Sequence, residues 1–184
     1  MQYIEVEKKF ALPHPGALKA KLAELGAKPA EPTRQVDAYY NAPHRDFLAP
    51  AAISEWLRIR TEDRGSSINF KRWHPMDALV KTHADEYETK VEDVEAIRRT
   101  LEALDFTPLV TVDKTREEWA LPEVEIVFDH VADAGDFVEF EFKGDAANVE
   151  DATKQLEEFI SSLKVELGEQ INRGYPHILL GRDH

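Results

Sequence analysis

The chain of 184 residues contains no cysteine. This absence excludes disulfide bonds, thiolate metal sites and cysteine nucleophiles, so packing must hold the fold and the chemistry must use oxygen, nitrogen or a bound metal. No apolar run approaches the ~18 residues of a membrane-spanning helix, and the first residues lack the basic and then apolar layout of a signal peptide. We therefore expect a cytoplasmic protein that does not interact with membranes.

Basic residues are scarce relative to acidic ones. Lys and Arg number 23 against 36 Asp and Glu, which gives a formal net charge of -13. This charge repels a phosphate backbone, so we expect no nucleic-acid partner unless the bases gather in one place. For the surface acids alone, a role in solubility or in adaptation to high salt stays open.

Several catalytic motifs are also missing. There is no glycine-rich phosphate loop and no Ser/His/Asp order typical of a hydrolase. The seven histidines are scattered along the chain, and no two lie at the helical spacing of metal ligands. Any metal would therefore depend on carboxylate ligands.

The chain reads as one unit without repeats or flexible linkers, so its length predicts a single domain over residues 1–184. Eight segments alternate apolar and polar residues with a period of two, which predicts strands over Tyr3–Phe10, Val36–Tyr40, Trp56–Thr61, Ser67–Arg72, Glu86–Val91, Thr111–Trp119, Glu123–Asp129 and Phe137–Lys143. Three further segments have helical spacing, around Leu18–Leu25, Val94–Leu104 and Leu156–Leu163, with Asn148 as a plausible cap.

Three or more strands follow one another between helices, which favours an antiparallel α+β fold over a parallel sheet. Two long connections, 41–54 and 73–85, interrupt the pattern. Each is either a mobile flap or a tolerated surface excursion.

The polar faces of the predicted strands are nearly pure Glu, Lys and Arg. Because side chains alternate across a strand, Arg58 and Arg60 share a face, as do Glu139 and Glu141. Such pairs place like charges about 7 Å apart, which a protein tolerates best when a ligand of opposite sign lies between them. The pattern therefore indicates a binding surface.

We predict an eight-stranded antiparallel closed barrel, a tunnel with a charged lumen, whose outward apolar faces are covered by the amphipathic helices. An open sheet with an exposed face of salt bridges is the alternative. The lumen would hold the bases Lys9, Arg58, Arg60, Lys71, Lys90, Lys114, Arg116 and Lys143, and the acids Glu5, Glu7, Glu86, Glu88, Asp129, Glu139 and Glu141. Clustered guanidinium groups suit phosphate oxygens, and clustered carboxylates suit Mg²⁺ or Mn²⁺, so the lumen could bind a metal-bound polyphosphate.

Seven segments, in order, resemble the CYTH group, the triphosphate tunnel enzymes. The opening Glu5-Val6-Glu7-Lys8-Lys9 is the Glu-x-Glu-x-Lys signature of that group, and the other segments are Val36–Tyr40, Trp56–Arg60, Phe70–Arg72, Asp113–Arg116, Val127–Asp129 and Phe137–Lys143. Arg173-Gly174-Tyr175 falls where the group often has Arg-Ser-Tyr before a last short helix, although Pro176-His177 replaces the usual helix-opening residues.

The resemblance implies a tunnel that binds a triphosphate with one or two divalent ions. It implies metal ligands at Glu5, Glu7, Asp129, Glu139 and Glu141, and phosphate-binding bases at Lys9, Arg58, Arg60, Lys71, Lys114 and Arg116, with Lys143 a weaker candidate. Within these sets, Glu5, Glu7, Lys9 and Asp129 are expected to be catalytic. Glu86, Glu88 and Arg173 match positions whose roles are less uniform.

The length, the loop at Pro43 and the Asp133–Asp136 turn look most like class IV adenylyl cyclases, which convert ATP to cyclic AMP and pyrophosphate. Inorganic triphosphatase or thiamine triphosphatase activity is the first alternative, and a non-catalytic module that binds polyphosphate or nucleotides is the second. The substrate would be ATP, tripolyphosphate or thiamine triphosphate. Exposed strand edges or helices could also support a homodimer.

Overall fold

The structure is a computed structural model that describes residues 3–181, with side chains described from Val6 onward. One antiparallel sheet contains β1 (Tyr3–Glu5), β2 (Glu7–Ala11), β3 (Lys28–Pro29), β4 (Thr33–Asn41), β5 (Glu55–Glu62), β6 (Gly65–His74), β7 (His83–Val91), β8 (Thr107–Ala120), β9 (Val124–Val131) and β10 (Gly135–Phe142). The helices are α1 (Gly16–Glu24), α2 (Val94–Ala103), α3 (Val149–Ser162) and α4 (Tyr175–Leu179). None of these helices is both long and apolar enough to cross a membrane.

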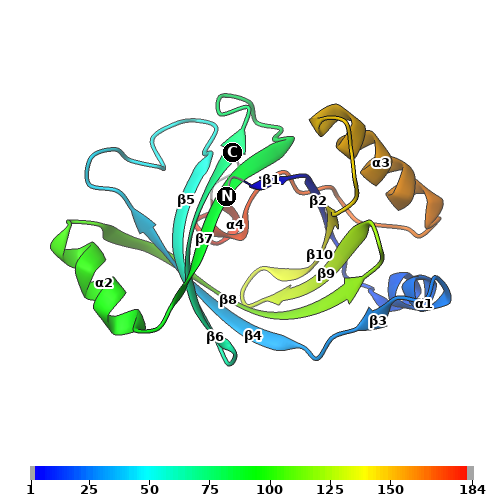
Figure 1. The fold of residues 1–184 in the computed structure, drawn as a ribbon, viewed down its shortest axis with the longest axis horizontal. Coiled ribbons are helices and arrows are strands. Elements are labelled where there is room, and N and C mark those ends of the chain that lie inside the picture. The colour runs from blue at the N-terminus through cyan, green and yellow to red at the C-terminus, as the bar shows by residue number, and fades with distance from the viewer. Residues whose placement is uncertain (1–2, 182–184) are drawn as a thin grey trace.

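The N-terminal segment closes the sheet on itself (Figure 1). The strand order is β1-β7-β6-β5-β4-β8-β9-β10-β2, so the path begins and ends with the two halves of one segment. β1 pairs with β7 and β2 pairs with β10, and the chain changes partner at Val6. With β1 and β2 taken as one strand and the two-residue β3 set aside, the eight predicted strands and the α+β tunnel fold are confirmed.

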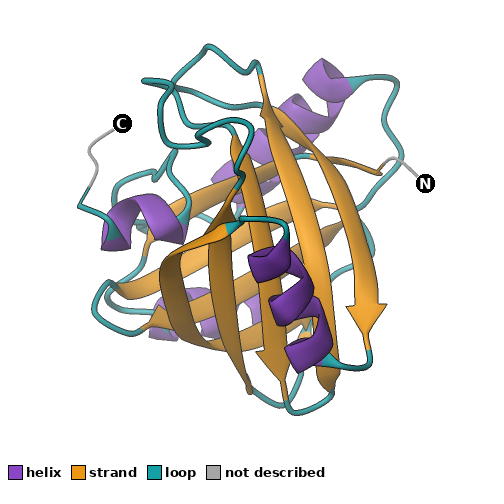
Figure 2. Ribbon diagram, turned by 90° about the vertical axis from the view of Figure 1, so that its left-hand side faces the viewer, coloured by secondary structure: helices purple, strands orange, loops and turns teal. Residues whose placement is uncertain are grey.

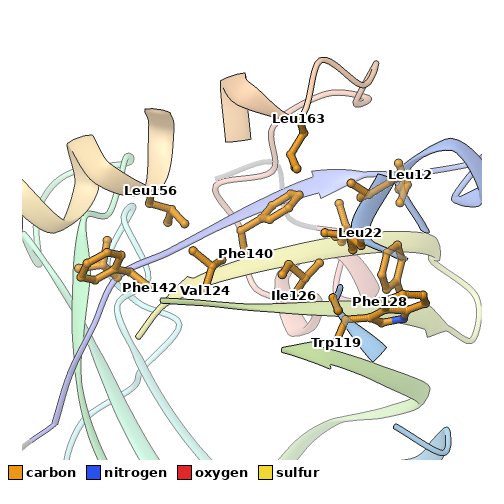
Figure 3. Close-up of a cluster of buried hydrophobic side chains, with 14 of the residues drawn as sticks. Leu12, Leu22, Trp119, Val124, Ile126, Phe128, Phe140, Phe142, Leu156 and Leu163 are labelled. Carbon is orange, nitrogen blue, oxygen red and sulfur yellow. The ribbon is translucent and has the colours of Figure 1, made fainter. Parts of the chain in front are cut away.

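Helices cover the outer face of the barrel, as the amphipathic pattern predicts. α1 and α3 pack on the outside of β9 and β10, where Leu18 and Leu156 are fully buried against Phe140. Figure 3 shows Leu156 and Leu163 directed toward Phe140 and its neighbours. α2 lies across the opposite side of the sheet (Figure 2) and buries Leu101 against Ile59. This burial of apolar area leaves the inner faces free to carry charge.

Side-chain caps fix where two of the covering helices begin. The Asn148 side chain accepts a hydrogen bond from the backbone N–H of Asp151 at 2.9 Å, which confirms the predicted cap of α3. Asp93 caps α2 in the same way through Ala96, also at 2.9 Å. Each such cap is worth about 1 kcal/mol.

One end of the barrel interior is filled by apolar side chains. Val112, Val131 and Phe137 point inward and pack with Tyr175 of α4. The five-residue α4 is too short for its periodicity to be read from the sequence, although the resemblance implied a short helix there. It forms the floor of the space that the charged residues surround.

Candidate functional site

The inward-facing charged residues surround a cavity of about 280 Å³. The predicted residues that line it are Glu7, Lys9, Arg58, Arg60, Lys71, Glu86, Glu88, Lys114, Arg116, Glu139, Glu141 and Lys143. They come from six strands, β2, β5, β6, β7, β8 and β10, with Lys143 directly after β10, and the alternation of each strand places them on the same inner surface. The sequence pattern thus brings together most of the predicted site.

Four other predicted residues lie elsewhere. Asp129 is fully buried beside the cavity and does not line it. Arg173 lines a neighbouring cavity, and its backbone carbonyl accepts a hydrogen bond from Lys9 at 3.2 Å. Lys90 is exposed and is not part of the lining, so its predicted place in the lumen is wrong. The side chain of Glu5 lies outside the described residues, although its backbone pairs with Ala84.

Two arginines of β5 are held by one buried carboxylate. Asp37 of β4 is only 1% exposed and accepts two hydrogen bonds from Arg60, at 2.7 and 2.8 Å. Arg58 lies 3.5 Å from the same carboxylate, and its buried Nε–H makes no hydrogen bond within the described part of the chain. Despite the cost of burial, Arg58 and Arg60 hold the pKa of Asp37 well below its usual range. The carboxylate therefore stays ionised and fixes both guanidinium groups at the cavity wall.

Asp129 of β9 is a second buried carboxylate, and it holds Arg116 of β8. Arg116 donates two hydrogen bonds to Asp129, at 2.8 and 2.5 Å, and a third to Glu139 at 2.7 Å. The hydroxyl of Tyr175 also donates to Asp129, at 2.8 Å. Burial opposes the ionised form, but Arg116 and Lys114 lower the pKa of Asp129. The oxygens of Asp129 are therefore occupied by Arg116 and Tyr175, and they fix the Arg116 guanidinium at the cavity wall.

Lys114 is a buried base of the cavity whose pKa is strongly lowered. Its side chain is 2% exposed, and its Nζ lies 3.5 Å from Asp129. Burial lowers the pKa of Lys114 to about 7, reinforced by the neighbouring Arg116 and opposed by Asp129 and Asp37. The lysine therefore gains and loses its proton near neutral pH, and an anion in the cavity would favour the charged form.

Lys9 of β2 and Glu139 of β10 form an ion pair at the cavity wall. The Lys9 Nζ lies 3.0 Å from Glu139 and 4.2 Å from the centre of the Tyr175 ring. Burial disfavours ionisation of Glu139, but Lys9 and Arg116 hold its pKa well below the usual range. Tyr175 thus supports Lys9 through its ring and Asp129 through its hydroxyl, so α4 is part of the site.

Carboxylates dominate the β2 and β10 side. Glu7 and Glu141 are directly opposite each other in the strand register, and both line the cavity. Burial raises the pKa of Glu141, and Glu7 raises it further, whereas Lys143, 2.6 Å away, lowers it. Lys71 lies 3.6 Å from Glu7. Two opposed carboxylates in a partly buried place favour a cation between them.

Comparison with known proteins agrees with this geometry. The family model for the CYTH domain matches residues 3–175. The chain belongs to the CYTH family. Members of this family are triphosphate-processing enzymes that bind triphosphate substrates and generally depend on divalent metals.

Similar proteins cover most of the chain. A protein of Methanocaldococcus jannaschii named "Putative adenylate cyclase" is 32% identical over 161 residues, which span 88% of each chain. The structure of a protein from Pyrococcus horikoshii OT3 has a TM-score of 0.77 and 26% identity, and covers 94% of this chain and 98% of that one. A Hippeastrum protein described as a "putative adenylyl cyclase" with a dominant triphosphatase activity has a TM-score of 0.63 and 16% identity, with 99% and 97% covered.

The CYTH cavity carries donors that fit a hard divalent cation. Glu7, Glu139 and Glu141 supply oxygen ligands of the kind that Mg²⁺ and Mn²⁺ prefer. Among the described residues, however, no group of three or more His, Asp or Glu is gathered closely enough to hold a metal ion by itself. The chemistry of the donor set fits, and phosphate oxygens of a substrate would complete the coordination, as is usual for Mg²⁺.

Sequence reasoning assigned no role to several residues of the CYTH site, among them Glu125, which lines the cavity, and the three discussed next. Asp37, Tyr39 and Asn69 point inward, where Asp37 holds both arginines and Asn69 donates to Glu86 at 2.6 Å. Asp37 carried a usable signal, because it is an acid on the same alternating face of its strand as Tyr39. Asn69 shares a face with Lys71 and could have been found in the same way.

Proposed function

We propose that this CYTH protein is a divalent-metal-dependent enzyme that converts ATP to cyclic AMP and pyrophosphate in the barrel cavity, as class IV adenylyl cyclases do. One observation carries the proposal: four bases with pre-set positions, Arg58, Arg60, Lys114 and Arg116, share one cavity with a pair of opposed carboxylates. Bases alone would suit any polyanion, whereas the added carboxylates suit a metal-bound one.

The arginines hold the phosphates. A guanidinium group has five N–H donors, and Arg60 uses two of them on Asp37, so further donors can reach phosphate oxygens. Among the described residues, the buried Nε–H of Arg58 finds no hydrogen-bond acceptor. An acceptor supplied by the substrate would satisfy this donor and recover the free energy lost by its burial.

Glu5, Glu7, Glu139 and Glu141 would hold the metal. A bound divalent ion would neutralise charge that develops on the phosphate oxygens. Asp129 remains a candidate ligand and catalytic group, although its present contacts with Arg116 and Tyr175 suit a supporting role. Lys71 and Lys143, which lie close to Glu7 and Glu141, would bind phosphate oxygens next to the metal.

In the cyclase reaction, the ribose 3′-hydroxyl attacks the α-phosphorus of ATP, the bond from the α-phosphorus to the bridging oxygen breaks, and pyrophosphate leaves. The bases on β5 and β8 hold the departing phosphates, and a cavity carboxylate accepts the proton of the hydroxyl. The contribution of the barrel is to fix these groups before the substrate arrives, which lowers the entropic part of the barrier.

Hydrolysis of a terminal phosphate is the second candidate. The same cavity suits tripolyphosphate or thiamine triphosphate, and the Hippeastrum protein of the same fold is described with a dominant triphosphatase activity. In that reaction water attacks the terminal phosphorus, the bond from this phosphorus to the bridging oxygen breaks, the diphosphate part leaves, and the terminal phosphorus becomes orthophosphate. The groups of the chain are shared, and only the phosphorus that faces the attacking oxygen differs.

Product analysis tests the proposal. The purified protein, with Mg²⁺ or Mn²⁺, is given ATP, tripolyphosphate and thiamine triphosphate in parallel, and products are followed by phosphorus NMR. Cyclic AMP with pyrophosphate is expected. Orthophosphate from any of the three substrates without cyclic AMP would assign a triphosphatase instead.

A double variant separates catalysis from mere binding. Glu139→Ala combined with Glu141→Ala removes two metal-side carboxylates, so turnover should be lost while metal-free binding of tripolyphosphate persists. If binding and turnover are both unchanged, the metal site is elsewhere. If the wild-type protein binds triphosphates with no turnover of any, the chain is a non-catalytic binding module.

A further inference from the structure

A second cavity adjoins the first. It measures about 240 Å³ and lies between the chain at residues 80–82 and the C-terminal segment 170–174. We call it the apolar pocket; its lining includes Ile53, Trp56, Trp73, Val80 and Ile171. The two cavities share Glu7, Lys9, Trp56, Trp73 and Gly174, so a molecule that extends from one to the other must pass these residues.

The charges around the apolar pocket are already matched within the chain. Lys8 pairs with Glu157 at 2.6 Å, and Lys81 donates to the Ser54 hydroxyl at 2.6 Å and to the carbonyl of Pro75 at 3.0 Å. Glu7 and Lys9 lie at the junction with the charged cavity, and Arg173 and His177 also line the pocket; the rest of the wall is made of indole rings, aliphatic side chains and neutral polar groups such as Asn172. Such a surface favours an uncharged group over another phosphate.

The indole N–H of Trp56 is a hydrogen-bond donor at the junction of the two cavities. The Trp56 ring is buried, and its Nε1–H makes no hydrogen bond with any residue that the structure describes. Position 174 is glycine, and a Cβ there would lie 3.8 Å from this nitrogen. Because a buried donor without a partner costs free energy, a ligand with an acceptor next to an apolar body would be stabilised here.

The other end of the charged cavity has the opposite chemistry. A third cavity of about 270 Å³ shares Arg60, Glu88 and Arg116 with it, and its other lining residues are mainly polar or charged, among them Gln35, Glu62 and Arg64. None of its lining residues belongs to the apolar pocket. A triphosphate that carries an organic group therefore meets two different ends, of which only one suits the organic group.

We propose that the apolar pocket binds the nucleobase of a nucleoside triphosphate, and that Glu7 and Lys9 flank the phosphate that carries the nucleoside. The terminal phosphate then lies toward Arg60 and Arg116. This inference rests on the proposed function, since it assumes that the charged cavity binds the triphosphate. It sets the orientation of the substrate and places the α-phosphate beside the β2 carboxylate, as the cyclase reaction requires.

Binding to two ligands tests the orientation. Dissociation constants for ATP and for tripolyphosphate are measured by calorimetry in metal-free buffer, for the wild-type protein and for Val80→Trp. Val80 is 57% exposed, so a larger side chain can be accepted without repacking of the core while it fills the pocket. Leu104→Trp is the matched control, because Leu104 is also 57% exposed and follows α2, away from the pocket.

The ratio of the ATP affinity to the tripolyphosphate affinity tests where the nucleobase binds. In Val80→Trp, ATP should bind about tenfold or more weakly with tripolyphosphate within about twofold of the wild type, and Leu104→Trp should change neither. A ratio that stays constant in Val80→Trp overturns the inference, as does a wild-type protein that binds tripolyphosphate and not ATP. Failure of both ligands to bind the wild-type protein would instead overturn the proposed function.

Tryptophan fluorescence gives an independent measurement. Of the three tryptophans, Trp56 and Trp73 line the apolar pocket, whereas Trp119 packs in the outer core. Because both rings also border the charged cavity, each ligand can change the emission, but stacking or close contact of a nucleobase should make the quenching by ATP clearly stronger than that by saturating tripolyphosphate. Equal quenching by both ligands contradicts a base in this pocket.

Discussion

The two sides of the charged cavity are built on different principles. On the basic side, Arg60 and Arg116 each share two hydrogen bonds with a buried carboxylate, Asp37 or Asp129. On the acidic side, Glu7 and Glu141 face each other, and Glu7 helps to raise the pKa of Glu141. The bases are held in place before a ligand arrives, whereas the acids retain a repulsion that a cation would remove.

The basic side is therefore built to position phosphate groups, whereas the acidic side is built to attract a metal ion. The clamped bases lose little conformational entropy when a phosphate binds, because the protein has already fixed them. The opposed carboxylates keep the charge that draws in a metal. Substitution on the two sides should therefore have opposite effects on the stability of the free protein.

Removal of the buried carboxylate that holds the β5 arginines, which we call the inner clamp, should have the largest effect on the free energy of unfolding. Asp37→Asn leaves Arg58 and Arg60 buried beside a neutral amide, so the free energy of unfolding should fall by about 3–5 kcal/mol. The measurement is urea denaturation followed by circular dichroism. Unchanged stability would show that the inner clamp carries no more weight than a surface ion pair.

The outer face of the same strands provides the control. Arg34 donates two hydrogen bonds to Asp113, at 2.9 and 2.6 Å, with the same geometry as the inner pair. These side chains are 68% and 39% exposed, so water and salt screen them. Asp113→Asn should leave the stability nearly unchanged, which isolates burial as the cause of the difference.

Substitution of the acidic pair should separate stability from activity. Because the pKa of Glu141 is raised, ionisation of this group above its ordinary pKa destabilises the folded protein. Glu141→Gln removes that cost, so unfolding at pH 7 should be unchanged or up to about 1 kcal/mol less favourable. Metal-dependent turnover should nevertheless fall about 100-fold or more. A destabilised variant would show that the pair with Lys143 outweighs the repulsion.

The sequence predicted the faces of the strands and not the contacts across them. Alternation alone puts Arg58, Arg60, Glu139 and Glu141 on the inner surface, and the structure places them there. It does not reveal that Asp37 meets Arg60, because that contact depends on the register between β4 and β5. Register is set by the whole sheet, including the closure at Val6, and no single segment encodes it.

Loss of the Tyr175 hydroxyl should have a moderate effect on the basic side. Tyr175→Phe removes the 2.8 Å hydrogen bond to Asp129 and keeps the ring beneath Lys9 and Lys114. One lost hydrogen bond to a charged group should weaken triphosphate binding about tenfold. The metal-free dissociation constant checks this, and Tyr175→Leu, which also removes the ring, should weaken binding further. If the two variants behave alike, the ring contributes nothing.

The smallest effect should be a proton uptake on binding. Because the pKa of Lys114 is about 7, much of this lysine is neutral at pH 7.5, and a bound triphosphate should raise the pKa and recharge it. Affinity should therefore decline as pH rises from 7 to 8.5. Calorimetry in buffers of different ionisation enthalpy measures the uptake, which should disappear in Lys114→Met. A pH-independent affinity in the wild-type protein contradicts the shift.

Periodicity predicted neither of the shortest elements, although the family resemblance implied a short helix at the C-terminal floor. α4 has five residues and β3 has two, too few for any period to emerge. The structural importance of Tyr175 follows from where α4 docks, which depends on contacts with residues more than 40 positions away, such as Asp129. Long, strongly alternating strands are readable from sequence, whereas the parts that complete the barrel are defined by tertiary contacts.

The two ends of the chain meet on β2. The backbone N–H of Ala11 donates to Glu169 at 2.9 Å, and that of Ile171 donates to Lys9 at 2.8 Å, so the strand that carries Glu7 and Lys9 is flanked by the last segment of the chain. During synthesis on a ribosome, this first strand must wait for nearly all other residues before its neighbours exist. The site is therefore completed only after residues 169–175 have been synthesised, and a nascent chain truncated before residue 169 should have no complete site.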